Sequence, residues 1–368
     1  MTLPPFETEA FYAEYEFVAP HLLSVSDCET LSVKALLELA GRDPAQLLNL
    51  GLGYTESQGS LSLRRAIAET YKDVTPDEVL VLGAPVEGIY LSIQTLLDPG
   101  DEAIVLTPAY DALLNLPKAR AAVKPWPLKG EAGSWVLDWD ALDALLTSKT
   151  KLIVVNFPHN PTGFLPTQEE LDRLVGVAEA RGLWLFSDEM YRGLEFGARP
   201  PLTSACDYER SVVLSGLSKT YGLPGLRAGW LVVKDTELRR ALLNAKLYTS
   251  ICPPAPVELL AEIALSVRDE LAARSRATVR HNLELAEPFF RRWTNFFEWR
   301  APLAGSVALV GIDAPSAEAY CRDLARAAGV VLLPSSFLGY GDAHVRFGFG
   351  REGFGAALAA YGAHLSSL

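Results

Sequence analysis

Short apolar runs alternate with stretches of helical periodicity through the middle of the chain. The runs lie at residues 79–82, 103–106, 152–155, 183–186, 212–214 and 230–233. The helical stretches between and around them lie at 61–71, 87–97, 139–146, 168–181 and 236–245. Strands that alternate with helices in this way predict an α/β fold, with a mostly parallel sheet that has helices on both faces.

The pattern changes after residue 250, where Pro253-Pro254-Ala255-Pro256 precedes a long helical stretch expected at 257–290. Mixed strands and helices then follow to the end of the chain, which predicts a second, smaller α+β domain. We expect three parts: an N-terminal arm that includes part of the small domain (1–45), a large domain (46–250) and the C-terminal small domain (251–368).

Composition argues against several classes of protein, namely nucleic-acid-binding, membrane-spanning, secreted and metal-binding proteins. The 33 Lys and Arg against 45 Asp and Glu give a net charge of −12, and an acidic surface repels nucleic acid. No apolar run approaches the ~20 residues of a membrane-spanning helix. The first 17 residues carry four glutamates and lack the pattern of a secretory signal, so we expect a cytoplasmic protein. The spacing of Cys and His predicts no metal site.

Gly348, Gly350 and Gly353 match the G-x-G-x-x-G pattern of dinucleotide-binding loops. Only 15 residues follow Gly353, which is too few to complete a βαβ unit. We therefore interpret these glycines as a flexible entry into a C-terminal helix.

Four apolar runs are each followed at once by residues suited to reactive chemistry. In a parallel sheet the carboxyl ends of the strands meet at one edge, where ligands bind. The four loops should therefore bring together an amine (Lys219), a carboxylate (Asp188), an amide (Asn160) and a phenol (Tyr191). The loops lie at 83–87, 156–163, 187–191 and 215–219.

Five motifs in order resemble the class I and II aminotransferases, the aspartate aminotransferase superfamily of fold-type I pyridoxal-phosphate (PLP) enzymes. The resemblance extends from about residue 50 to 346. It implies a seven-stranded sheet in the large domain and pyridoxal 5′-phosphate as cofactor. The motifs are LGYTESQGSLSLRRAIAE (52–69), LLDPGDEAIVLTPAY (96–110), NPTG (160–163), SDEMY (187–191) and SGLSKTYGLPGLRAGW (215–230).

The resemblance assigns roles around the cofactor ring. Lys219 resembles the lysine that condenses with the cofactor aldehyde and then moves a proton between Cα and C4′. Asp188 resembles the carboxylate that keeps the pyridine nitrogen protonated. Asn160 and Tyr191 resemble the two donors to the phenolic oxygen, and Tyr110 resembles the aromatic residue that stacks on the ring.

The phosphate would be held by Arg227, by the backbone N–H groups of Ala84 and Val86, and by Ser215 and Ser218. The sequence departs from the family here in two ways. The loop at 83–87 is one residue longer than usual and its proline has no N–H, and a glycine stands at 216, where many members carry a hydroxyl.

Two further residues extend the site. Tyr54 resembles the tyrosine that reaches the cofactor phosphate of a partner subunit, which implies a homodimer with a shared active site. Arg346 resembles the arginine that pairs with the α-carboxylate of the substrate. Tyr12, Tyr15 and Phe17 lie where an N-terminal arm could cover the cavity, so we expect an apolar or aromatic substrate side chain over an acidic one.

The leading hypothesis is transfer of an amino group between an L-amino acid and a 2-oxo acid. The cofactor weakens every bond at Cα, so a PLP-dependent lyase that eliminates at a C–S bond, or a ring-forming enzyme, remains an alternative. A less favoured alternative is a non-catalytic sensor of the same fold. That class usually carries an N-terminal DNA-binding module, for which few residues are left.

Overall fold

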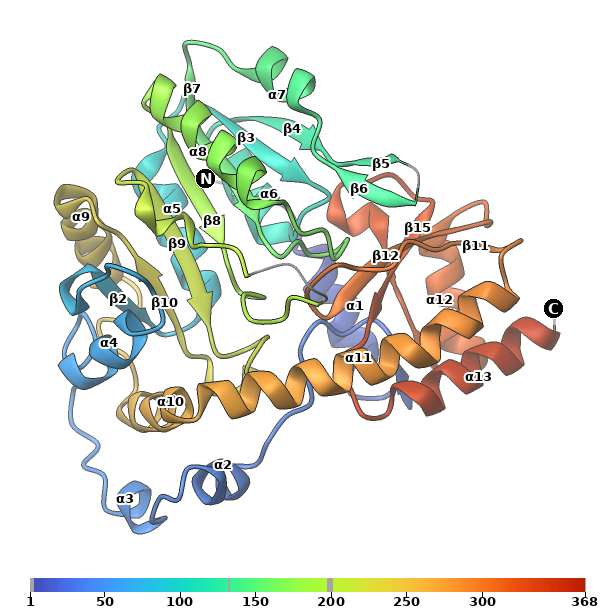
Figure 1. The fold of residues 1–368 in the computed structure, drawn as a ribbon, viewed down its shortest axis with the longest axis horizontal. Coiled ribbons are helices and arrows are strands. Elements are labelled where there is room, and N and C mark those ends of the chain that lie inside the picture. The colour runs from blue at the N-terminus through green and yellow to red at the C-terminus, as the bar shows by residue number, and fades with distance from the viewer. Residues whose placement is uncertain (1–2, 132, 197–200, 368) are drawn as a thin grey trace.

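The computed structural model describes residues 3–131, 133–196 and 201–367. A seven-stranded sheet forms the large part of the molecule, in the order β2-β10-β9-β8-β7-β3-β4 (Figure 1). Strand β10 runs antiparallel to β2 and β9, and the other neighbours are parallel. The α/β fold with a mostly parallel sheet is therefore confirmed. The strands are β2 (Val79–Leu82), β3 (Glu102–Thr107), β4 (Ala122–Pro127), β7 (Thr150–Asn156), β8 (Trp184–Asp188), β9 (Ser211–Gly216) and β10 (Gly229–Val232).

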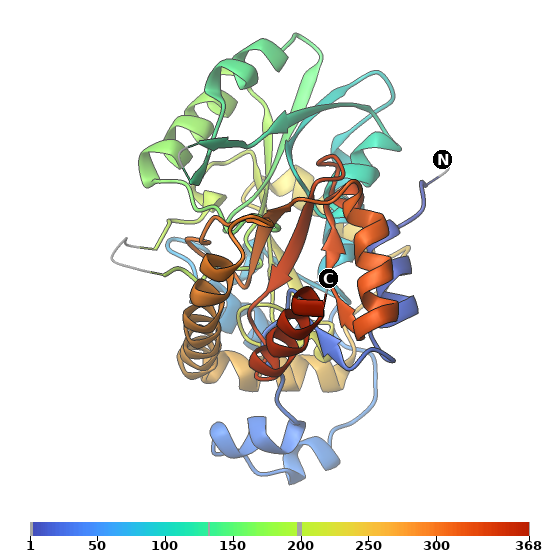
Figure 2. The same cartoon turned by 90° about the vertical axis from the view of Figure 1, so that its right-hand side faces the viewer.

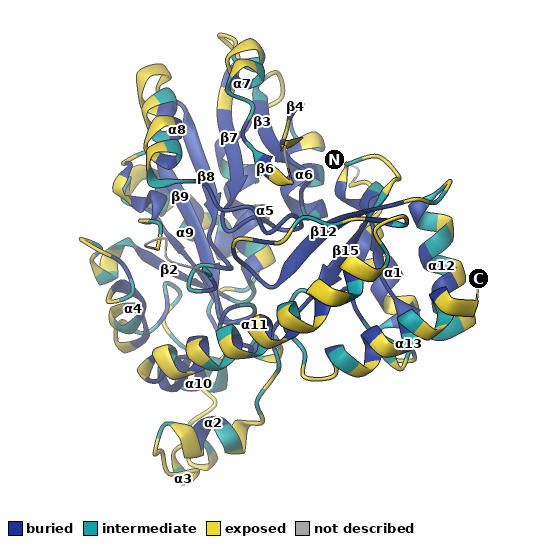
Figure 3. Cartoon of the chain, turned by 45° about the vertical axis from the view of Figure 1, so that its right-hand side comes forward, coloured by how far each residue is buried: buried dark blue, intermediate teal, exposed yellow. Residues whose placement is uncertain are grey.

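Helices cover both faces of this sheet, which explains why its strands read as continuous apolar runs. In β2, Val79 and Val81 pack into one hydrophobic cluster and Leu80 and Leu82 into another on the opposite face. The strands are buried while the outer helix faces are exposed (Figure 3). The helices of this part are α4 (Leu61–Ala68), α5 (Pro85–Leu96), α6 (Asp111–Lys118), α7 (Trp139–Leu145), α8 (Gln168–Arg181) and α9 (Thr236–Lys246).

A four-stranded antiparallel sheet, β11-β12-β15-β14, forms the second part (Figure 2). Its strands are β11 (Phe297–Glu298), β12 (Val307–Ile312), β14 (Leu333–Pro334) and β15 (His344–Gly348). Its helices are α11 (Arg268–Arg292), α12 (Ala317–Ala328) and α13 (Phe354–Ser367). Helix α10 (Ala255–Ser266) leads into α11 and packs on α4 of the large part. The division of the chain at residues 45 and 250 remains a prediction.

The N-terminal segment joins the second part. Strand β1 (His21–Leu22) pairs in parallel with β13 (Val330–Val331). The remaining elements are α1 (Glu7–Tyr15), α2 (Val33–Leu39), α3 (Ala45–Leu48) and the hairpin of β5 (Lys129–Glu131) and β6 (Ser134–Val136). Among the described residues, no helix is both long and apolar enough to span a membrane.

Among the differences from the expectations, three concern the longer elements. The single helix expected at 257–290 is divided into α10 and α11, which meet at Val267. Strand β4 was not expected, because it is an edge strand with two prolines and a single fully buried residue. Helix α6 was also not expected, because its sequence contains Pro117 near its end.

The glycines at the end of β15 allow another backbone to approach closely. A Cβ atom on Gly348 would lie 1.8 Å from the Val25 carbonyl oxygen, and one on Gly350 would lie 2.3 Å from that of Asp27. Gly348 N–H donates to the Leu23 carbonyl at 2.7 Å. These glycines therefore hold the segment after β1 against the small sheet. The sequence suggested only a flexible entry into α13, and it did not predict that these glycines pack against another backbone segment.

Candidate active site

A cavity of about 440 Å³ lies at the carboxyl ends of the central strands, where the N-terminal segment and β15 also meet. Because β2, β7, β8 and β9 all point to this edge, the four loops converge as the sequence predicts. Nine of the predicted site residues line the cavity: Val86, Tyr110, Asn160, Asp188, Tyr191, Ser218, Lys219, Arg227 and Arg346.

Lys219 follows β9 and directs its amine into the cavity, where Nζ donates to the Ser26 hydroxyl at 2.8 Å. Burial lowers the pKa of Lys219, and the carboxylates of Asp27 and Glu9 oppose this effect. A lowered pKa increases the fraction of neutral amine, which is the form that attacks a carbonyl carbon.

Asp188 ends β8 and is buried. Its Oδ1 accepts a hydrogen bond from the Met190 N–H at 3.0 Å. Burial raises the pKa of Asp188 to about 7, while the Met190 N–H and the charge of Lys219 act to lower it. A buried carboxylate of this kind is stabilised by a cationic ligand, and a protonated pyridine nitrogen is such a ligand.

The loop after β7 fixes Asn160 beside Asp188. The Asn160 N–H donates to Asn156 Oδ1 at 2.7 Å, and Asn156 Nδ2 donates to the Asp188 carbonyl at 2.8 Å. Asn160 Oδ1 accepts from Arg346 at 3.0 Å. The Asn160 amide nitrogen is therefore the atom of this side chain that remains to donate to a ligand oxygen.

Two buried hydroxyls test whether the cavity fits PLP. Tyr191 and Ser218 are 3% and 4% exposed, and among the described residues neither side-chain oxygen has a hydrogen-bond partner. Burial raises the pKa of Tyr191, so its phenol remains a donor. An unpaired buried hydroxyl costs stability unless a ligand completes it. The phenolic oxygen and the phosphate of PLP are the acceptors these two hydroxyls need.

The predicted phosphate loop reaches the cavity through Pro85 and Val86. A Cβ on Gly229 would lie 2.8 Å from Pro85 Cγ, and one on Gly216 would lie 3.1 Å from the same atom. Pro85 therefore packs against the backbone at 216 and 229, and a Cβ at 216 would also lie 2.7 Å from the Ala228 carbonyl oxygen. Arg227 is exposed at this end of the cavity, and its guanidinium donates to the Pro224 carbonyl at 3.0 Å.

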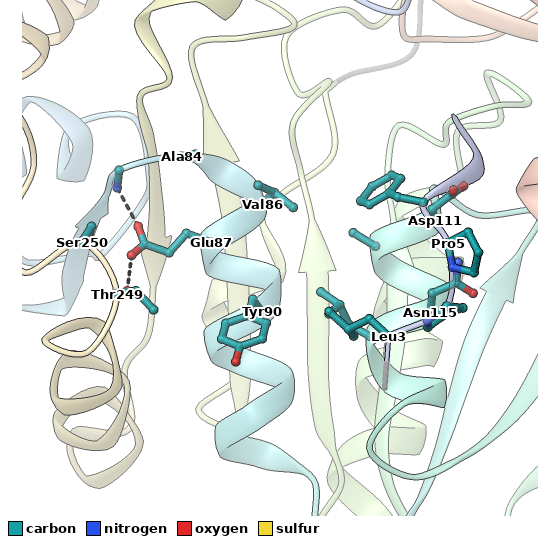
Figure 4. A pocket seen from close by; sticks show the side chains of 15 residues that line it. Leu3, Pro5, Ala84, Val86, Glu87, Tyr90, Asp111, Asn115, Thr249 and Ser250 are labelled. Atoms are coloured by element: carbon teal, nitrogen blue, oxygen red, sulfur yellow. Dashed lines mark hydrogen bonds between the residues drawn. The ribbon is translucent and has the colours of Figure 1, made fainter. Parts of the chain in front are cut away.

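Three predicted residues do not line this cavity. Ser215 lies within β9, opposite Trp230 of β10. Ala84 lines a neighbouring cavity of about 620 Å³ between α5 and the residues before α1 (Figure 4). The Glu87 carboxylate beside this cavity accepts a hydrogen bond from the Gly83 N–H at 2.7 Å. Tyr54 is 91% exposed and lines a third cavity, beside α10.

Arg346, on β15, is a buried cation that is 2% exposed. It donates to the Ser24 carbonyl through Nε at 3.1 Å and to the Tyr12 hydroxyl at 2.8 Å. Within the described part of the chain, no carboxylate oxygen lies within 4.0 Å of its guanidinium. A buried charge without an opposite charge favours an anionic ligand.

The N-terminal segment supplies cavity residues that sequence motifs did not identify. Tyr12 was expected near the cavity and lines it, but Tyr15 packs on Phe11, and Phe17 is 87% exposed. Ser26 and Glu9 also line the cavity. Both are ordinary polar residues without a motif, and only the tertiary fold places them near Lys219.

Comparison with known proteins identifies the family. The model of aminotransferase class I and II matches residues 22–353. The chain belongs to this family. It is 32% identical over 322 residues to capreomycidine synthase of Streptomyces vinaceus, with 85% of this chain and 81% of that protein covered. The family is PLP-dependent, so the cofactor expected from the sequence is confirmed.

Solved structures agree with this assignment. A PLP-dependent aminotransferase from Streptococcus suis superimposes with a TM-score of 0.92 at 29% identity, covering 100% of this chain and 98% of that one. The PLP-dependent cyclase OrfR superimposes with a TM-score of 0.90 at 30% identity, with the same coverage. Both resemblances extend over the small part of the molecule as well as the large sheet.

Proposed function

We propose that this enzyme transfers an amino group between an L-amino acid and a 2-oxo acid. The observation that carries the proposal is that Arg346, a buried cation with no carboxylate partner in the described part of the chain, faces the same cavity as Lys219 and Asp188. The cavity therefore offers a cation for an α-carboxylate beside an amine that can accept the α-proton.

Bound PLP supplies an electron sink for the negative charge that develops at Cα. Arg346 would hold the α-carboxylate, and this fixes which bond at Cα is presented to the amine of Lys219. Lys219, whose pKa is lowered by burial, would take the proton from Cα and return it at the cofactor carbon C4′. Asp188 would hold the proton on the pyridine nitrogen.

The other lining residues would hold the cofactor. Asn160 and Tyr191 would donate to its phenolic oxygen, and Tyr110 would cover one face of its ring. The hydroxyl of Ser218, the guanidinium of Arg227 and the N–H of Val86 would bind the phosphate. Ala84 and Ser215 lie outside the cavity lining, so we give them no direct part.

A ring-forming or C–S lyase reaction is the second candidate, and the likeness to capreomycidine synthase and to the cyclase OrfR favours the ring-forming reaction. One experiment separates the two. The purified enzyme is incubated with PLP and single L-amino acids, and the products are identified by mass spectrometry. A 2-oxo acid with conversion of PLP to its amino form supports aminotransfer. A cyclic amino acid, or pyruvate with released thiol, contradicts it.

Arg346→Ala should weaken recognition of every α-amino acid by ~2 to 5 kcal/mol, because a desolvated charge pair is lost. The measurement is kcat/KM for phenylalanine, methionine and aspartate. Arg291→Ala, which removes an arginine exposed on α11, is the matched control. Thermal unfolding of both variants checks that the protein still folds. An unchanged kcat/KM in Arg346→Ala would remove the assigned role.

We also propose that the enzyme acts as a homodimer with a shared active site. Leu52, Tyr54 and Tyr248 are large exposed side chains, and an apolar cavity opens between α5 and the N-terminal residues (Figure 4). A partner subunit that covers this surface would bring its Tyr54 to the phosphate end of the cavity.

Mixing Tyr54→Ala with Lys219→Ala tests the shared site. Neither variant alone should be active, but a hybrid dimer contains one site with both residues. Random exchange of equal amounts should restore about a quarter of the sites, since half of the dimers are hybrids and each has one complete site. Activity is measured before and after subunit exchange, which is followed with two affinity tags. Proven exchange without recovered activity contradicts the shared site.

A further inference from the structure

Glu9 places a negatively charged side chain in the lining of the cavity, on the same helix as Tyr12. Helix α1 places Glu9 and Tyr12 on one face, three residues apart, or ~4.5 Å along the helix axis. Tyr12 contacts Arg346, which marks the end of the cavity that would take the α-carboxylate. Glu9 lies one turn earlier in the helix, and Oε1 accepts a hydrogen bond from the Tyr110 hydroxyl at 3.1 Å.

The Glu9 carboxylate has no cationic partner within 4.0 Å in the described part of the chain. Two other carboxylates near the cavity are already engaged. Asp27 forms an ion pair with Arg351, and Asp188 accepts a backbone hydrogen bond where the pyridine nitrogen would lie. Glu9 is exposed at the mouth of the cavity and is the lining carboxylate that neither an ion pair in the described residues nor an assigned cofactor contact occupies.

The cavity is marked as a ligand site independently of Glu9. Within residues 3–131, 133–196 and 201–367, the buried hydroxyls of Tyr191 and Ser218 have no hydrogen-bond partner, and the buried Arg346 has no counter-ion. Glu9 itself lies outside the part of the chain that matches the family model, which begins at residue 22. Its charge is thus a feature of this chain's N-terminal helix.

We propose that Glu9 selects amino acids with a long, cationic side chain. This inference rests on the proposed function, in which Arg346 holds the α-carboxylate. A side chain that ends in a guanidinium or ammonium group would reach Glu9 and form an ion pair with its carboxylate. A dicarboxylic amino acid would place a like charge there, which costs affinity. The polar lining at Glu9 replaces the apolar preference expected from Tyr15 and Phe17.

The test compares L-arginine with L-citrulline, which has nearly the same shape but an uncharged end group. The PLP-loaded enzyme is titrated with each, and the dissociation constant is read from the change in cofactor absorbance. We expect arginine to bind at least about tenfold more tightly than citrulline. In Glu9→Gln, which keeps the hydrogen-bond acceptor and removes the charge, this ratio should fall below about threefold.

Glu7→Gln is the matched control, because Glu7 is exposed on the same helix, as Glu9 is, but does not line the cavity. It should keep the arginine-to-citrulline ratio of the unmodified enzyme. Equal binding of the two ligands, binding of neither, or a ratio that survives in Glu9→Gln would overturn the proposal. A loss of affinity that is equal for both ligands would also overturn it, because Glu9 would then act through Tyr110 or Lys219.

Binding and turnover are measured separately, so the two proposals can fail independently. Selective binding of arginine without formation of a 2-oxo acid would contradict aminotransfer and leave the role of Glu9 intact. Formation of 2-oxo acids from uncharged amino acids, with citrulline bound as tightly as arginine, would support aminotransfer and contradict the role of Glu9.

Discussion

Lys219→Ala should fold, bind PLP weakly and lose the yellow absorbance of the bound cofactor together with turnover. Lys219 is the lining lysine of the cavity, and its amine is held in place by Ser26. Without that amine the α-proton has no acceptor, and the expected loss in kcat is at least ~10⁴-fold. The absorbance spectrum and single-turnover kinetics measure both effects.

Two companion variants make this result specific. Lys219→Arg keeps a positive charge but cannot condense with an aldehyde, so it should be as inactive as the alanine variant. Lys118→Ala removes an exposed lysine at the end of α6 and should behave as the unmodified enzyme. A Lys219→Ala enzyme that turns over at the normal rate would refute the assignment.

Asp188→Asn should bind PLP and slow proton removal from Cα by roughly 10³-fold or more, since the electron sink depends on a protonated pyridine nitrogen. Asparagine keeps an oxygen that can accept the Met190 N–H, so the loop should stay in place. Exchange of the α-proton with deuterated water, followed by NMR, measures this step without requiring complete turnover.

The neighbouring carboxylate provides the control for Asp188. Glu189 is also buried, but its Oε1 accepts hydrogen bonds from the Ser204 hydroxyl and the Ala205 N–H, and it does not line the cavity. Glu189→Gln should therefore affect thermal stability more than α-proton exchange. Equal loss of exchange in both variants would indicate a general disturbance of the loop, against a specific role for Asp188.

The sheet and most of the site could be predicted because both depend on local sequence. Lys219, Asp188 and Asn160 follow buried strands directly, and parallel strand ends meet at one edge. Whether each single residue of these loops lines the cavity could not be predicted in this way. Ser215 lies within its strand, and Ala84 lines the neighbouring cavity.

Contacts between segments that are far apart in the sequence could not be predicted from the sequence pattern either. Ser26 contacts Lys219 across 193 positions, and Thr8 contacts Asp111 across 103. No motif marks these pairs, because they depend on how the two sheets and the N-terminal segment pack together. The glycines at 348 and 350 were conspicuous in the sequence, but their partner, the backbone at 25–28, could be identified only from the fold.

The way in which the N-terminal segment is attached to the small sheet has a consequence for how substrate specificity can change. The segment is fastened by main-chain bonds, from Leu23 N–H to the Val331 carbonyl and from Gly348 N–H to the Leu23 carbonyl. Main-chain bonds do not depend on which side chains the segment carries. Side chains of this segment can therefore be replaced without detaching it from the sheet. Such replacements would alter which amino acid the cavity admits, while the residues after the central strands would still bind the cofactor.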